Sequence, residues 1–109
     1  MSELQIMAVM YEASKWICQK VEKLPRSYRF TLGDRLVNTA LDLYLLLVEA
    51  QYTSNRGRIL KQANLELEKL RHLLRLSQEL TDLSLKSYGY ICAQLDQVGK
   101  MIGGWQKSV

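Results

Sequence analysis

The sequence predicts an all-α protein that folds as an antiparallel, up-down-up-down four-helix bundle, in a single domain covering residues 1–109. Apolar residues recur at spacings of three and four in four separate segments, which is the period of amphipathic helices. One proline and six glycines in 109 residues argue against a loop-rich or β-rich fold. Each segment of about 20 residues is about 30 Å long as a helix, and short connections favour antiparallel neighbours.

The first two helices are expected on either side of Pro25. The first helix should end at or just before this proline, because the residue before a proline disfavours helical geometry. Its buried face is predicted to contain Ile6, Met10, Ala13, Ile17, Val21 and Leu24. The second helix, about residues 31–51, has one apolar face with Leu32, Leu36, Ala40, Leu43, Leu47 and Ala50, and a second with Val37, Leu41, Tyr44 and Val48.

The third helix is expected over about residues 56–76, after the polar cluster at 53–57. Its core positions are Leu60, Ala63, Leu67, Leu70 and Leu74, and a second apolar row contains Leu65, Leu73, Leu76 and Leu80. The segment 77–84 separates it from the fourth helix and offers two possible N-caps, Thr81 and Ser84. Apolar surface beyond what one core needs indicates a partner surface, and self-association is the simplest such partner.

The fourth helix has the most regular pattern of the chain, with core positions Tyr88, Ile91, Leu95, Val98, Ile102 and Trp105. Glycine inside a helix costs roughly 0.8 to 1 kcal/mol relative to alanine. Two interpretations of the glycines stay open. Gly99 and Gly103 share one face and would let another backbone approach closely, or Gly103 and Gly104 mark a frayed C-terminus.

The formal net charge of +4 lies entirely between residues 56 and 75, a segment with six basic and two acidic residues. Arg71 and Arg75 are four apart and share a helix face with Lys61. This stripe is either a phosphate-binding face or a solvated flank of the core. A second basic set, Arg26 and Arg29, alternates with aromatic residues in "PRSYRF" and either binds a phosphate and stacks a base or braces the interhelical turn.

Catalysis, metal binding and membrane insertion are not expected. His72 is the one histidine, no serine or cysteine is near a plausible base, and no glycine-rich phosphate loop is present. Cys18 and Cys92 lack metal-ligand spacing and are interpreted as packed thiols. The longest strongly apolar run, residues 43–48, is far below the roughly 20 residues that span a bilayer. We therefore expect a cytoplasmic, non-enzymatic protein without a cofactor.

Three stretches carry a resemblance to a known family: "KLPRSYRFTLGDRLVNTALDLYLLLVEAQY", "LRHLLRL" and the C-terminal "QVGKMIGGWQK". The chain resembles the accessory variability determinant family of diversity-generating retroelements over nearly its whole length. The four-helix intervening-sequence proteins, encoded within bacterial large-subunit ribosomal RNA genes, are related to this family. The segments "PRSYRFTLGDRL" and "IGGW" are the most specific parts of the resemblance.

The resemblance implies a four-helix protomer in a barrel-shaped homopentamer with a basic surface. It also implies binding to the retroelement reverse transcriptase and to its template RNA, and possibly to DNA, in support of mutagenic retrohoming. The implied binding residues are Arg71 and Arg75, with Arg26, Arg29 and Lys61 as further candidates. Two alternatives stay open: an intervening-sequence-type protein linked to ribosomal RNA, or a purely structural helical oligomer.

Overall fold

The computed structural model describes residues 3–109 and confirms the all-helical fold. Four long helices make up the bundle, and within the described residues no strand is present. Their bounds are α1 Glu3–Val21, α3 Leu32–Gln51, α4 Arg56–Leu80 and α5 Leu85–Lys107, with a short helix, α2, over Arg26–Arg29. The bundle measures 42 × 23 × 18 Å, so its length is that of the helices themselves.

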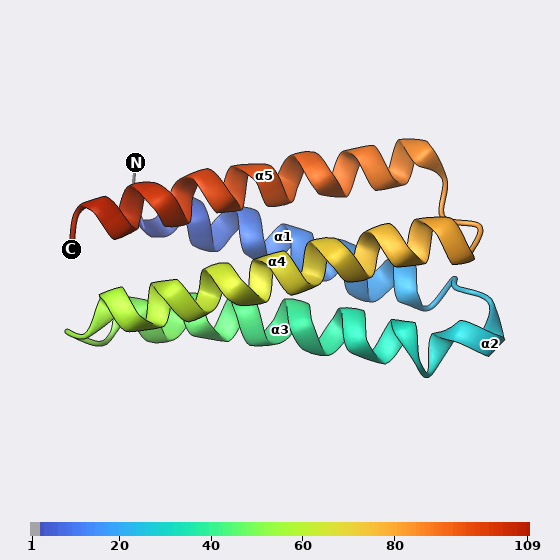
Figure 1. Cartoon of the computed structure of the whole chain (residues 1–109), viewed down its shortest axis with the longest axis horizontal. Helices are drawn as coiled ribbons and strands as arrows, with labels where there is room; N and C mark the ends of the chain where they lie inside the picture. Colours follow the sequence, from blue (N-terminus) through green and yellow to red (C-terminus); the bar gives the residue numbers. More distant parts are fainter. Residues whose placement is uncertain (1–2) are drawn as a thin grey trace.

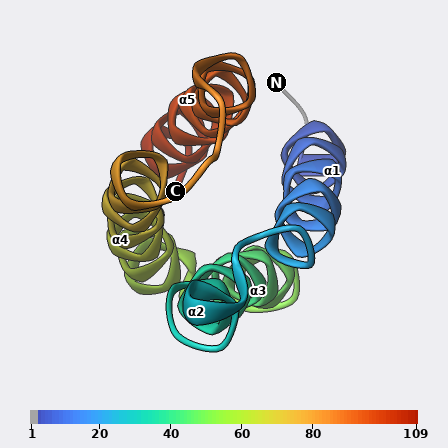
Figure 2. The same cartoon turned by 90° about the vertical axis from the view of Figure 1, so that its right-hand side faces the viewer.

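Consecutive long helices run in opposite directions and surround a common interior (Figure 1). The end-on view in Figure 2 shows the order α1, α3, α4, α5 around the bundle. Helix α5 packs against both α4 and α1, so it borders two interhelical grooves, although the chain connects it only to α4. These two grooves contain the charged and aromatic groups described below.

Most of the core consists of the residues that the helical period predicts. Two hydrophobic positions differ: Tyr88, a predicted core residue, is only partly buried, and Ile59 is buried although it was not predicted. Leu43, Leu60, Leu67, Leu95 and Ile102 are fully shielded from solvent. Burial of each such side chain contributes roughly 1.5 to 3 kcal/mol relative to exposure, so this shared interior is the main term that holds the four helices together. Trp105, near the C-terminal end of α5, is also buried.

The connection between α1 and α3 contains a helix that the sequence pattern did not predict. Pro25 precedes α2, and its carbonyl oxygen accepts hydrogen bonds from the backbone amides of Tyr28 (2.9 Å) and Arg29 (3.1 Å). Proline suits this place because its fixed φ angle fits the start of a helix. Just beyond, a Cβ atom at Gly33 would lie 2.7 Å from Cγ1 of Val21. The end of α1 and the start of α3 therefore approach closely because residue 33 has no side chain.

The boundary between α4 and α5 differs from the expected one. Helix α4 continues to Leu80, and Thr81 ends it by donating from its hydroxyl to the carbonyl oxygen of Ser77 at 2.6 Å. Ser84 is the N-cap of α5, since its Oγ accepts from the amide of Ser87 at 3.1 Å. The alternative N-cap at Thr81 is therefore wrong.

Helix α5 decides between the two interpretations of its glycines. It continues through both adjacent glycines to Lys107, so the interpretation of a frayed C-terminus is wrong. Gly99 packs against α4, whereas a Cβ atom at Gly103 or Gly104 would meet nothing within 4 Å in the protomer. The close approach expected at both Gly99 and Gly103 thus occurs at Gly99 alone in the protomer.

The second apolar rows of α3 and α4 differ in how far they are buried in the protomer. On α3, Val37 and Tyr44 are half-buried against the core, and the Tyr44 ring lies 6.0 Å from that of Tyr11 on α1. This row is therefore partly used within the protomer, contrary to its expected role as surplus surface. On α4, Leu73 of the second row is partly buried against the core, whereas the other three remain outside, with exposed fractions of 56% for Leu65, 43% for Leu76 and 48% for Leu80.

Candidate nucleic-acid interface

Arg71 lies in the groove between α4 and α5 and bridges the two helices. Its Nη1 donates to Oε1 of Glu68 at 2.6 Å, and its Nη2 reaches Oδ1 of Asp96 at 3.3 Å and the carbonyl oxygen of Leu95 at 3.4 Å. The side chain is 35% exposed. Arg71 thus has two carboxylate partners, one on its own helix and one on α5.

Gly99 makes room for this bridge. A Cβ atom at this position would lie 3.0 Å from Nη2 of Arg71 and 3.3 Å from Cδ2 of Leu67. The guanidinium group therefore lies against bare backbone of α5, and its Nε is buried without a hydrogen-bond partner among the described residues. The loss of helix propensity at Gly99 is the cost of this close helix contact.

The other residues of the predicted basic stripe lie nearer to solvent. Arg75 is 72% exposed, and its Nε lies 3.6 Å from Oε1 of Glu79. Lys61 is exposed near the N-terminal end of α4. Around the arginine pair, the carboxylates of Glu68, Glu79 and Asp96 outnumber the two guanidinium groups. The stripe that looks basic in sequence is therefore neutralised over much of its length.

Tyr88 and Cys92 of α5 lie close to Arg75 and Glu79 in the same groove. Burial raises the pKa of the Tyr88 phenol, and a hydrogen bond with the Cys92 thiol raises this pKa further. Arg75 acts in the opposite direction and lowers the pKa of Tyr88. This part of the groove therefore favours the neutral phenol.

The second predicted basic set lies at the α2 end of the bundle (Figure 1). Nη2 of Arg29 donates to the carbonyl oxygen of Leu24 at 3.2 Å, so this arginine braces the turn. Its Nε is buried without a partner in the described part of the chain. Arg26 and the neighbouring Phe30 are exposed. The bracing interpretation therefore fits Arg29, while Arg26 keeps its charge in solvent.

Two aromatic and lysine clusters were missed in the sequence. Trp16 of α1 and Tyr90 of α5 have ring centroids 5.6 Å apart, and Nζ of Lys20 lies 5.4 Å from the Trp16 ring. On the other side of α1, Nζ of Lys15 lies 5.6 Å from the ring of Tyr11. Both lysines follow their aromatic residue by four positions, and this spacing was a usable signal. The partner rings on other helices had no such signal.

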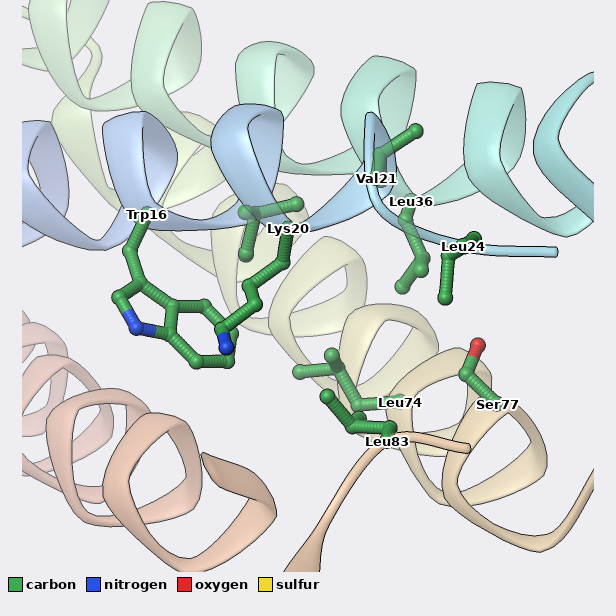
Figure 3. A pocket seen from close by; sticks show the side chains of 9 residues that line it. Trp16, Lys20, Val21, Leu24, Leu36, Leu74, Ser77 and Leu83 are labelled. Carbon is green, nitrogen blue, oxygen red and sulfur yellow. The ribbon is translucent and has the colours of Figure 1, made fainter. Parts of the chain in front are cut away.

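A narrow apolar pocket lies beside the Trp16 cluster. It is lined by Trp16, Ile17, Lys20, Val21, Leu24, Leu36, Leu74, Ser77 and Leu83. Figure 3 shows Lys20 extending from α1 beside the Trp16 ring, with Leu74 and Leu83 across the pocket. The Ser77 hydroxyl already donates to the carbonyl oxygen of Leu73 at 2.8 Å. The pocket therefore has apolar walls and one cation at its edge.

Metal binding and membrane crossing have no support within residues 3–109. No three His, Cys, Asp or Glu side chains of this range gather closely enough to hold a metal ion. None of its helices combines the length and the apolarity that a bilayer crossing requires. His72 is exposed on α4 and lines a shallow groove with Arg35 and Thr39 of α3. The expected absence of catalysis and cofactors stays a prediction.

Comparison with known proteins places this bundle in a family. A family model described as bAvd-like matches residues 5–109, which is nearly the whole chain. The chain belongs to the bAvd-like family. This confirms the resemblance to the accessory variability determinant family and identifies a protein of that accessory type, while the link to intervening-sequence proteins stays a prediction. No curated protein and no solved structure matches the bAvd-like chain.

Proposed function

We propose that this bAvd-like protein is a non-enzymatic, cytoplasmic accessory protein of a diversity-generating retroelement. In this role it binds the element's reverse transcriptase together with template RNA or complementary DNA, and so supports mutagenic retrohoming. The family match over residues 5–109 is the observation that carries the proposal. The net charge of +4 is compatible with an anionic partner.

Assembly into a homopentamer is the second part of the proposal. Support comes from the outer face of α4, where Leu65, Leu76 and Leu80 remain about half exposed in the protomer. Because each side chain is already about half covered, covering the rest would contribute about half of the roughly 1.5 to 3 kcal/mol of full burial, so a repeated contact across this face would stabilise an oligomer. Gly103 and Gly104, where an added Cβ atom would meet nothing within 4 Å in the protomer, are further positions where a second subunit has room to pack.

Light scattering tests the assembly. The wild-type protein should have a mass several times the 12.6 kDa of the protomer, and Leu76→Glu should dissociate it without loss of helix content. Leu85→Glu is the matched control, because Leu85 is exposed at the start of α5, outside the α4 face. A wild-type monomer at micromolar concentration contradicts the assembly.

Co-purification with the reverse transcriptase encoded beside the gene tests the partner. The two proteins should elute together from gel filtration. The accessory protein should also bind RNA, and its affinity should fall as the salt concentration rises. For each tenfold rise in salt, the logarithm of the association constant should fall by roughly 0.7 to 0.9 per phosphate contact. Lys61→Gln and Arg26→Gln should weaken that binding and flatten the salt slope, because both side chains are exposed. Absence of both interactions rejects the proposed function.

A further inference from the structure

The groove between α1 and α5 presents aromatic faces next to a cation. Trp16 and Tyr90 face each other across this groove at 5.6 Å, with their ring planes inclined by 41°. Tyr90 is 48% exposed, whereas Trp16 is half-buried against the core. The groove thus has one anchored ring and one ring that is accessible to solvent.

The charge on Lys20 is not neutralised by a carboxylate. Its ammonium group lies over the Trp16 ring, and within residues 3–109 no acidic side chain is within salt-bridge distance of it. Lys15, which occupies the equivalent position over Tyr11, is paired with Glu12 at 3.7 Å. Lys20 therefore keeps a positive charge available beside exposed aromatic surface.

We propose that Trp16, Lys20 and Tyr90 form a stacking site for an unpaired nucleotide of single-stranded nucleic acid. A nucleobase stacks on the Tyr90 ring at the edge of the groove, and Lys20 contacts the adjoining phosphate. Stacking uses the ring face that every base has, and the phosphate carries no sequence information, so the site is tolerant of sequence. The inference rests on the proposed function and assigns its nucleic-acid contact to α1 and α5.

The size and charge of the site favour a nucleotide over a side chain of a partner protein. The pocket beside Trp16 is small: its volume of about 10 Å³ has room for about one water molecule. An apolar anchor residue of a protein needs a deeper pocket than this, whereas a flat base needs only an exposed ring face. The unpaired charge of Lys20 adds complementarity to a phosphate.

Tryptophan fluorescence gives a direct test. The chain has two tryptophans, and the buried one is removed as Trp105→Phe, so that emission reports on Trp16 alone. A 12-nucleotide oligouridine should quench this emission as it binds, because a base stacked on Tyr90 lies close to the Trp16 ring. A double-stranded RNA of the same length should leave the emission unchanged, since its bases are already stacked and paired.

Matched variants distinguish binding at this site from nonspecific attraction to the positive charge of the protein. Tyr90→Leu should weaken oligouridine binding about tenfold, the scale of one stacked base. Lys20→Gln should weaken it and flatten its salt dependence, because it removes a phosphate contact. The controls Lys15→Gln and Tyr11→Leu remove the same groups from the other cluster and should change affinity by less than about twofold. Circular dichroism and thermal unfolding check that all four variants fold, and Lys20→Gln alone suffices if Tyr90→Leu is unstable.

Three results overturn the stacking site while leaving the proposed function intact. The first is RNA binding by the wild type without quenching, and the second is an equal loss of affinity in Lys15→Gln and Lys20→Gln. The third is that the Lys20 and Tyr90 variants keep their RNA binding but no longer bind the reverse transcriptase or no longer form the oligomer. The last result would assign the groove to a protein partner. Failure of the wild type to bind any nucleic acid rejects the site together with the nucleic-acid part of the proposed function.

Discussion

The two grooves that border α5 contain similar residue types but differ in how their cations are paired. In the α4–α5 groove, Arg71 and Arg75 each have a carboxylate partner, and Asp96 reaches Arg71 from the opposite helix. In the α1–α5 groove, Lys20 has an indole ring as its neighbour and no carboxylate among the described residues. The groove with more positive charge in sequence is therefore the more neutralised one in the fold.

The difference shows that the availability of a cation depends on the facing helix. A guanidinium group held between two carboxylates must release them before it binds a phosphate, so part of the binding energy is lost. A lysine over an aromatic ring gives up a weaker interaction, about 0.5 to 1 kcal/mol at exposed sites. The predictions below test whether the α4–α5 groove is mainly structural and the α1–α5 groove mainly accessible.

The largest expected effect is on stability, at Gly99. Gly99→Val should lower the free energy of unfolding by about 1 to 3 kcal/mol, because the new side chain meets Arg71 and Leu67 where a Cβ alone would already be 3.0 and 3.3 Å away. Urea denaturation followed by circular dichroism measures it. Gly89→Val is the control, because a Cβ atom at Gly89, on the same helix, would meet nothing within 4 Å, and it should leave stability unchanged or slightly raised. Equal effects at the two positions would show that the helices do not approach closely at Gly99.

A smaller effect is expected from Arg71, and a still smaller one from Arg75. Arg71→Ala should cost about 1 kcal/mol, since it removes a partly buried bridge to Asp96 and Leu95, with a discount for its solvent-exposed part. Arg75→Ala should cost less than about 0.5 kcal/mol, because its pair with Glu79 is exposed. Urea denaturation of both variants measures the difference. Equal costs would mean that Arg71 is only a surface residue, as the solvated-flank interpretation holds.

Much of the fold was predictable because helical periodicity reports burial directly. Leu60, Leu95 and Ile102 were predicted core residues and are fully buried. The period of one helix carries no information on its register against another. The pairing of Arg71 with Asp96, 25 positions away, therefore had no sequence signal. The same limit explains why Tyr44 was interpreted as surplus surface although it contacts Tyr11.

Within the candidate site, the residue types were easier to predict than their roles. Arg29 was recognised as a basic residue beside aromatic ones, but its hydrogen bond to the carbonyl of Leu24 depends on the geometry of the turn before α2. The four-residue helix α2 is too short for its period to be read from sequence. The lysine over Trp16 was missed, although the spacing between Trp16 and Lys20 places both on one helix face and could have predicted the contact.

A small effect, comparable to that of Arg75→Ala, is expected for the energetic coupling between Trp16 and Tyr90. A double-mutant cycle with Trp16→Leu and Tyr90→Leu should give a coupling of about 0.5 kcal/mol, near the lower end for aromatic pairs, because one ring is half exposed and the planes are tilted. The four unfolding free energies from urea denaturation provide the value. The cycle between Arg71→Ala and Asp96→Ala should give a larger coupling, because Arg71 is the less exposed partner of a charge-assisted bridge between helices. If instead the coupling energy of the aromatic pair exceeds that of the Arg71–Asp96 pair, the two rings contribute strongly to the packing of α1 against α5. A stacked base would then have to compete with the contact between the rings.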